Sequence, residues 1–246
     1  MTLRVMTYNV HRCVGTDRRL DPGRIADVIA AAQPDVVALQ ELDVGRARTG
    51  GVDQAHAIAQ LLGMRSHFHA ALKVEEERYG DAILTALPER LVRAGPLPGY
   101  PRIPGLEPRG ALWVEVEKDG VTWQVINTHL GLVPKEQQVQ AAALARDWLA
   151  DARFVSPGVL LGDFNATPYS VAYKILAGGM SDAQKLNGKT PTACFPSSFP
   201  FLRIDHVFVT KKVKVTQVSS PFHAKSRTAS DHLPLVVDLQ VAAPSP

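Results

Sequence analysis

Polar side chains that could do chemistry lie at the ends of apolar segments in this sequence or, in one case, inside such a segment. The set contains two histidines, four carboxylates and two asparagines: Asn9, Glu41, His129, Asp163, Asn165, Asp205, Asp231 and His232. Oxygen ligands without a cysteine cluster favour a hard cation such as Mg²⁺ or Mn²⁺ over zinc. Histidines with carboxylates to pair with favour acid–base catalysis. A metal ion beside acid–base groups, in a mildly basic chain, predicts hydrolysis of a phosphoester bond.

Each of these residues has an ordinary structural interpretation when it is taken alone. An Asp or Asn after a strand is usually a turn residue or a helix cap, and a lone histidine usually packs in the core or lies on the surface. The set is more informative, because polar groups at strand ends in an α/β protein tend to line one rim, where ligands bind.

The elements that must position these groups are short apolar strands that alternate with amphipathic helices. Asp21 is the expected cap of a helix that begins at Pro22, and Lys118-Asp119-Gly120 carries a hairpin turn signal. Helices are expected over residues 22–32, 53–62, 134–150 and 170–177. Strands are expected over residues 3–10, 35–40, 80–86, 110–117, 121–128, 157–161, 203–210, 213–219 and 233–241. Residues 95–108, rich in proline, are expected to form a long ordered loop.

Composition narrows the class of protein. The chain has 246 residues, 46% hydrophobic and 21% charged, which excludes an intrinsically disordered protein. There is no internal repeat or linker, so we expect one α/β domain with mixed sheets over residues 1–246. A net charge of +3 suits an anionic substrate without requiring a nucleic acid. The distant Cys13 and Cys194 exclude a disulfide framework and a thiolate zinc site. Without a signal peptide or a membrane-spanning stretch, we expect a cytoplasmic protein.

Seven short motifs resemble, in order, those of the endonuclease/exonuclease/phosphatase superfamily, and the resemblance extends from residue 3 to about residue 240. The motifs are Thr7–His11, Leu39–Glu41, Tyr79–Leu84, Asn127–Leu130, Gly162–Pro168, Ile204–Val207 and Ser230–Pro234. The resemblance implies a metal-dependent phosphohydrolase that uses Mg²⁺ or Mn²⁺. It also implies a four-layer α/β sandwich, in which two mixed β-sheets lie face to face and are flanked by helices.

The resemblance assigns roles to individual residues. Asn9 and Glu41 match metal-binding positions, and Asp231 contributes to the metal site directly or through water. Asp163 matches the carboxylate that orients the attacking water, and Asn165 matches the group that contacts a phosphate oxygen.

The same resemblance implies two catalytic histidines. His232 matches the essential histidine, paired with the carboxylate of Asp205. His129 matches a second histidine, which faces the scissile phosphate or the leaving group. Tyr79 and Asp81 share one motif, and we expect Asp81 to orient His129 and raise its basicity; a turn-capping role for Asp81 is the alternative.

Two further residues are candidates for substrate binding. His11 is expected one pleat beyond Asn9 on the same face, where it either touches the substrate or supports the site by packing. Arg109 begins a strand after the proline-rich loop, where it either clamps a phosphate in a bidentate manner or is simply solvated.

The substrate class is less constrained than the reaction. Abasic-site endonucleases carry a Tyr-x-Pro-Asn segment where this chain reads Asn127–Leu130, so the chain is closer to the sphingomyelinase, deadenylase and phosphatase branches. Apolar side chains in the loops 95–108 and 195–202 either hold an acyl chain or a base, or cover sheet edges. We expect a monomer that acts on a small or lipid-linked phosphoester. The alternative is a nuclease on DNA or RNA, and a catalytically inactive binding module is disfavoured because every catalytic position is filled.

Overall fold

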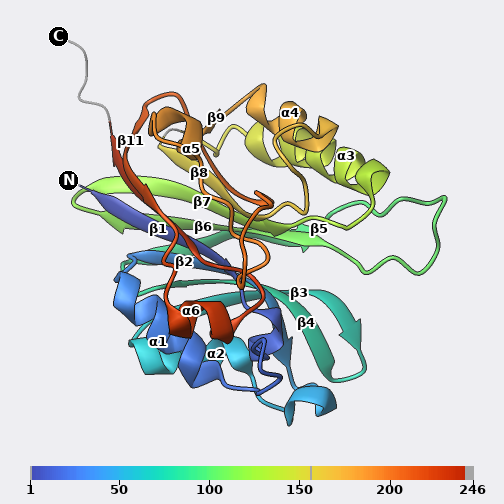
Figure 1. Ribbon diagram of the computed structural model, residues 1–246. Coiled ribbons are helices and arrows are strands. Elements are labelled where there is room, and N and C mark those ends of the chain that lie inside the picture. The colour runs from blue at the N-terminus through green and yellow to red at the C-terminus, as the bar shows by residue number, and fades with distance from the viewer. Residues whose placement is uncertain (1, 156, 242–246) are drawn as a thin grey trace.

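Two six-stranded mixed sheets form the centre of the computed structural model, which describes residues 2–155 and 157–241 (Figure 1). The first sheet consists, in spatial order, of β11 (Val213–Ser219), β12 (Leu235–Val241), β1 (Leu3–Asn9), β2 (Val36–Val44), β4 (Glu77–Thr85) and β3 (Arg65–Val74). The second consists of β5 (Glu89–Pro96), β6 (Gly110–Lys118), β7 (Val121–His129), β8 (Gly158–Asp163), β10 (Asp205–Val209) and β9 (Ser181–Asp182).

Helices cover the outer face of each sheet (Figure 1). The first sheet carries α1 (Pro22–Ala32), α2 (Gln54–Leu62) and α6 (Ala224–Ala229). The second carries α3 (Pro134–Ala143), which continues as a π-helical segment (Leu144–Leu149), and α4 (Val171–Ala177). The short α5 (Ala183–Leu186) packs against β10 and β11. Two 3-10 turns, His11–Cys13 and Ala47–Thr49, follow β1 and β2. The expected four-layer α/β sandwich is confirmed.

Three clusters of buried apolar side chains lie between the four layers of sheets and helices. Between the sheets, inward side chains of both interdigitate, as Val5 and Val237 do with Leu112 and Leu161. A second layer packs β1 and β2 against α1 and α2, and a third packs β6, β7 and β8 against α3 and α4. Strands such as β2 and β8 are therefore buried on both faces, which explains their unbroken apolar runs.

Local sequence signals fix several element boundaries as expected. The Asp21 side chain accepts a hydrogen bond from the backbone N–H of Arg24 (3.0 Å), which caps α1. Gly63, at φ 64°, ends α2 in the left-handed conformation that favours glycine. Cys13 and Cys194 are both free and buried.

The edge strands β3 and β5 lie outside the expected elements. Their residues are half-buried or exposed, and both strands carry charged or histidine side chains, such as His67, Lys73 and Arg90. An edge strand buries little apolar surface and often carries charge, so its alternating pattern is weak.

Within the residues described, no helix is both long enough and apolar enough to cross a membrane.

The topology brings the carboxyl ends of two parallel strand pairs together. In the first sheet β1 runs parallel to β2 and places Asn9 beside Gln40. In the second sheet β7 runs parallel to β8 and places His129 beside Asp163. The side chain of Asn9 reaches across to Asp163, so the two strand-end clusters meet between the sheets.

Candidate active site

A cleft of about 630 Å³ opens where these strand ends meet. Its walls include six of the eight polar residues that the sequence places at the ends of or within apolar segments: Glu41, His129, Asp163, Asn165, Asp231 and His232. Asn9 and Asp205, buried to 1% and 0% exposure, lie behind the walls and contact them through hydrogen bonds. The tertiary structure therefore brings all eight strand-end residues into one site.

Glu41 reaches the cleft because β2 is irregular at this point. The pairing of β2 with β4 shifts register between Leu39 and Leu42, and Glu41 has a φ of 63°. Such a bulge re-aims a side chain that regular alternation would send elsewhere. The amide nitrogen of Asn9 then donates to Glu41 Oε1 (2.9 Å) and to Asp163 Oδ2 (2.9 Å). Asn9 thus holds the carboxylates of two different sheets in place.

The donor set suits a hard divalent cation. Glu41 and Asp231 both present carboxylates to the cleft, and the side chain of Asp231 is 39% exposed. Asn9 Oδ1 already accepts a hydrogen bond from the backbone N–H of His11 (3.0 Å), so Asn9 orients ligands as well as being a candidate ligand. Carboxylate and amide oxygens are the ligands that Mg²⁺ and Mn²⁺ prefer. The residues present therefore fit the expected metal.

His232 is held between two carboxylates. Its Nδ1 lies 3.0 Å from Asp205 Oδ2, and its Nε2 lies 3.6 Å from Asp163 Oδ2. The ring of Phe195 packs against the imidazole at 4.7 Å between centroids. Burial alone would lower the pKa of His232, but Asp205 and Asp163 outweigh burial and raise that pKa to about 10. At neutral pH this histidine is an imidazolium.

Asp163 is the buried carboxylate at the centre of the site. It accepts hydrogen bonds from Asn9 Nδ2 and from the backbone N–H of Asn165 (2.8 Å), and burial raises the pKa of its carboxyl group. The preceding Gly162 has a φ of 151°, and a Cβ there would lie 1.8 Å from the carbonyl oxygen of Thr128. Only glycine lets β8 approach β7 closely enough to place Asp163.

The same carboxylate belongs to a second cluster that could hold a metal ion. One ligand atom each from Asp163, Asp205 and His232 lies within 4.8 Å of the others, and all three residues are buried. The Nδ1 of His232 is already occupied by Asp205, which suits an acid–base pair as well.

His129 meets a hydrogen-bond donor at both ring nitrogens. Arg109 Nη1 lies 3.0 Å from Nδ1, and Asn165 Nδ2 lies 3.1 Å from Nε2. A neutral imidazole has one acceptor nitrogen, so only one of these contacts can be a hydrogen bond. Asn165 Nδ2 has a second acceptor in the carbonyl oxygen of Leu130 (3.0 Å), whereas a guanidinium can only donate. Burial lowers the pKa of His129 well below its ordinary value, and the charges of Arg109 and His232 add to this effect.

The expected pairing of Asp81 with His129 is wrong. The ring nitrogens of His129 face Arg109 and Asn165, and Asp81 lies instead beside Glu41, whose backbone N–H it binds. Burial raises the pKa of Asp81 to about 8, and the charge of Arg109 opposes that rise. Asp81 belongs to β4 in the first sheet and His129 ends β7 in the second, so the packing of the two sheets decides whether they meet, and it places Arg109 and Asn165 at the imidazole instead.

Arg109 lies in the cleft wall, as expected for a substrate-binding residue, but its guanidinium already has partners within the protein. Its side chain is 7% exposed, and Nη1 pairs with Glu107 Oε1 at 2.7 Å in addition to contacting His129. Tyr79 also lines the cleft, with the guanidinium of Arg48 at 5.4 Å from its ring centroid.

The expected position of His11 is wrong. The strand β1 ends at Asn9, and His11 has a φ of 44° in the turn that follows, so it does not continue the pleat. Arg12, the next residue, lines the cleft instead.

Sequence reasoning also missed Arg12, Arg48 and Glu107 as cleft residues. Only Glu107 had a local signal, because it stands two residues from Arg109.

The two apolar loops differ in what they contribute. Phe195 and Leu202 line the cleft, and between them Phe199 and Phe201 are 77% and 64% exposed. In the proline-rich loop over residues 95–108, Glu107 lines the cleft. Leu97 is instead buried in the apolar core beside the second sheet. An apolar flank therefore borders the cleft on the side of residues 195–202.

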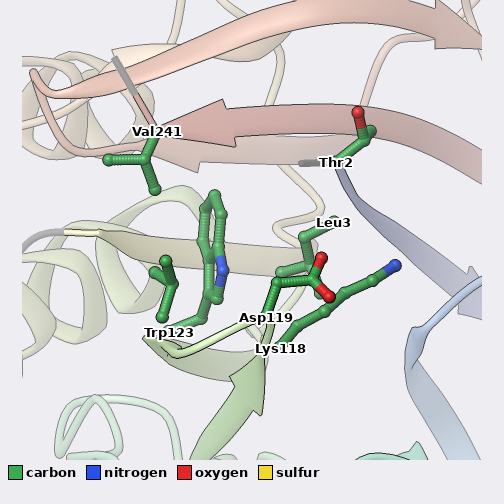
Figure 2. A pocket seen from close by; sticks show the side chains of 7 residues that line it. Thr2, Leu3, Lys118, Asp119, Trp123 and Val241 are labelled. Carbon is green, nitrogen blue, oxygen red and sulfur yellow. The ribbon is translucent and has the colours of Figure 1, made fainter. Parts of the chain in front are cut away.

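A smaller pocket lies at the opposite ends of the strands, away from this chemistry. It has a volume of about 170 Å³, and Figure 2 shows Leu3, Trp123 and Val241 around it, with Lys118 and Asp119 from the β6–β7 turn. Lys118 is paired with Asp35 at 2.6 Å.

Comparison with known proteins shows the family and the fold of the chain. The model of the endonuclease/exonuclease/phosphatase family matches residues 6–232. The chain is similar to an uncharacterized protein of Escherichia coli, YbhP, with 26% identity over 98% of this chain and 97% of the relative. It superposes on an endonuclease/exonuclease/phosphatase from Beutenbergia cavernae with a TM-score of 0.77 and 27% identity, covering 98% of this chain and 72% of that one. A mannosyl-6-phosphatase of Bacteroides thetaiotaomicron shares the fold, with a TM-score of 0.73 and 21% identity over 97% and 99% of the two chains.

Proposed function

The chain belongs to the endonuclease/exonuclease/phosphatase family, and from this membership and its cleft we propose a Mg²⁺- or Mn²⁺-dependent hydrolase of phosphoester bonds. The observation that carries the proposal is the meeting of Glu41 and Asp231 with the His232–Asp205 pair around Asp163. We take residues 1–246 as a single catalytic domain, which the family match over residues 6–232 supports.

Glu41 and Asp231, with Asn9 behind them, would hold the metal ion. A bound divalent cation supplies positive charge that polarises the phosphoryl oxygens and lowers the pKa of water. The fold contributes one carboxylate from β2, a second from the segment between α6 and β12, and a buried amide that fixes the first of them.

The protein's own groups account for the proton transfers. Asp163 accepts a proton from the water that attacks phosphorus, and burial, which raises the pKa of this carboxyl, makes it a better base. As the bond from phosphorus to the leaving oxygen breaks, the imidazolium of His232 donates its Nε2 proton to that oxygen. The proton on Asp163 then restores His232, whose Nε2 is 3.6 Å away.

His129 supplies a neutral donor in this scheme. Because Arg109 can only donate, Nδ1 is the acceptor and the ring proton of His129 sits on Nε2, which lies 3.7 Å from Asp163 Oδ2. Because Nε2 then carries a proton, Asn165 cannot donate to it, and its amide is left to contact a phosphate oxygen. Preorganised donors of this kind stabilise the charge that develops on phosphoryl oxygens. Arg109 is thus a positioning residue that acts through His129.

The apolar flank supports a small or lipid-linked phosphoester as the substrate. Phe195 and Leu202 in the wall, with Phe199 and Phe201 exposed beside it, offer contact to an acyl chain or an aryl group. The similarity to a mannosyl-6-phosphatase supports a small phosphoester. The exposed phenylalanines also keep a nuclease as the second candidate, because bases stack on aromatic side chains.

A substrate panel tests the proposal. Purified protein is assayed with Mg²⁺, with Mn²⁺ and with EDTA on bis(p-nitrophenyl) phosphate, a mononucleotide, phospholipid vesicles and plasmid DNA, beside the Glu41→Gln variant. We expect metal-dependent turnover of the small ester or the lipid and loss of it in the variant. Turnover unaffected by EDTA and by Glu41→Gln would refute the metal site, and efficient cleavage of plasmid DNA alone would favour the nuclease.

A further inference from the structure

Arg12 differs from the other arginines of the cleft in having no carboxylate partner among the residues that the structure describes. Arg48 binds both oxygens of Asp43, each at 2.7 Å, and Arg109 is paired with Glu107 at 2.7 Å. The side chain of Arg12 makes one hydrogen bond, from Nη2 to His11 Nε2 at 2.6 Å, and its Nε is buried without a partner. Its positive charge is therefore not neutralised by a carboxylate of residues 2–155 or 157–241.

A strained turn fixes the position of Arg12. His11, Arg12 and Cys13 have φ values of 44°, 57° and 58°, a left-handed conformation that costs about 1–2 kcal/mol for each residue other than glycine. Three successive residues of this kind persist only where their surroundings impose the conformation, and such strain is typical of ligand-binding sites. The sequence places neither glycine nor asparagine here, although both would relieve the strain.

Buried groups of other elements hold the turn. Gln54, fully buried at the start of α2, donates from Nε2 to the carbonyl oxygen of Arg12 (2.7 Å) and accepts from the backbone N–H of Asp43 (2.9 Å). The backbone N–H of His11 is bound by Asn9 Oδ1. The guanidinium is thus presented to the cleft from a defined position next to the metal-binding wall.

The neighbours of Arg12 place it beside the metal-binding wall, on a different sheet from His129 and Asn165. It contacts His11, whose Nδ1 lies 3.7 Å from Asp231 Oδ1. His129 ends β7 and Asn165 follows β8, both in the second sheet, whereas Arg12 follows β1 in the first sheet and His232 precedes β12 of that sheet. A guanidinium with free N–H groups binds a carboxylate or phosphate through two parallel hydrogen bonds.

We propose that Arg12 forms a subsite for a second anionic group, so that the substrate is a phosphoester with a further phosphate or carboxylate beyond the scissile phosphate. This inference rests on the proposed function, because it assumes that the other cleft residues engage the scissile group. A substrate of this class has a phosphoryl group at the metal wall, a second oxyanion at Arg12, and its remaining part free to contact the apolar flank.

Direct binding tests the subsite apart from catalysis. The probes are glycerol 3-phosphate, 3-phosphoglycerate and glycerol 1,3-bisphosphate, which share one phosphate and differ in the second anionic group. Their affinities for the Mg²⁺-loaded protein are measured by calorimetry, and turnover of bis(p-nitrophenyl) phosphate is measured in parallel. Failure of that turnover would count against the proposed function, whereas the ratio of probe affinities judges the subsite.

Variants of Arg12 are chosen so that the turn can still form. Asn tolerates positive φ, so Arg12→Asn removes the charge without adding strain, and Arg12→Lys keeps the charge but loses the two-pronged geometry. Arg90→Met, at an exposed arginine on β5, is the matched control. Thermal unfolding of each variant reports whether the fold is retained.

We expect the wild type to bind the two doubly anionic probes at least about tenfold more tightly than glycerol 3-phosphate. Hydrogen bonds to charged groups contribute about 1.5–3 kcal/mol, so Arg12→Asn should weaken the doubly anionic probes by about 10- to 150-fold relative to glycerol 3-phosphate. Arg12→Lys should keep part of the preference, and Arg90→Met all of it. A wild type without the preference would overturn the subsite, and so would an Arg12→Asn variant that weakens all three probes equally, since Arg12 would then bind the scissile phosphate.

Discussion

Replacing Arg109 with methionine should move the ring proton of His129 from Nε2 to Nδ1. The wild-type guanidinium lies 3.0 Å from Nδ1 and forces that nitrogen to accept. Methionine fills a similar volume and has no donor. The amide of Asn165, 3.1 Å from Nε2, then becomes the donor that determines the tautomer. Nε2 of His129 then has no proton to donate to the substrate.

The size of this effect follows from the contacts. A hydrogen bond from a charged donor contributes about 1.5–3 kcal/mol, which favours the Nε2–H tautomer by about 10- to 150-fold in the wild type. The neutral bond from Asn165 contributes about 1 kcal/mol, which favours the Nδ1–H tautomer by about fivefold in the variant. Losing a preorganised donor to the transition state lowers kcat by about 10²–10³, so Arg109→Met should approach that loss.

Nuclear magnetic resonance reads the tautomer directly. Long-range ¹H–¹⁵N correlation of labelled histidine distinguishes Nδ1–H from Nε2–H at neutral pH, where burial and nearby positive charge keep the pKa of His129 well below its ordinary value. His129→Ala assigns the signal. Arg109→Lys, which keeps a charged donor, and Glu107→Gln, which keeps Arg109, serve as controls and should retain Nε2–H. An Nδ1–H signal in the wild type, or an unchanged Nε2–H signal in Arg109→Met, would refute the reasoning.

Other perturbations test the remaining parts of the site. Glu41→Ala should abolish activity and retain the fold, and Mn²⁺ soaked into crystals should give density at Glu41; full activity with metal bound elsewhere contradicts the assignment. Because the pKa of His232 is raised to about 10, the alkaline limb of kcat/KM should fall as pH rises through that value. Asp205→Asn removes one of the carboxylates that raise this pKa, so the alkaline limb should move to lower pH, and an unmoved limb would exclude the pairing. Exchanging both Phe199 and Phe201 for alanine should raise KM for a lipid or aryl phosphoester more than for a minimal ester, as steady-state kinetics would show. Hydrolysis should depend weakly on salt between about 50 and 200 mM, where six to ten phosphate contacts would cost about 10³–10⁵ in affinity; a steep dependence would favour the nuclease.

Much of the fold was predictable because its signals are local. Asp21 with Pro22 starts α1, Gly63 ends α2, and the Asp119-Gly120 turn joins β6 to β7, each through backbone preferences that involve only a few neighbouring residues. The edge strands β3 and β5 were not predictable in this way, because their stability comes from pairing with one neighbour and not from burial of an alternating face.

The sequence also identified many of the side chains that the site contains. Asn9 and His129 end β1 and β7, and each of these strands runs parallel to a neighbour, so each residue lies beside the carboxyl end of that neighbour in its own sheet. Chemistry could therefore be inferred from residue types before any distance was known.

Which of these groups touch was decided by the tertiary structure. Asp81 and His129 belong to different sheets, so their separation depends on how the sheets pack, which no sequence spacing encodes. Ala111 pairs with Thr128, so Arg109 stands one residue beyond the position opposite His129, and counting from the β6–β7 turn would have found this neighbour. The bulge at Glu41 and the left-handed turn at Arg12 carry no such signal, because each conformation is unfavourable locally and persists only through contacts made by distant elements.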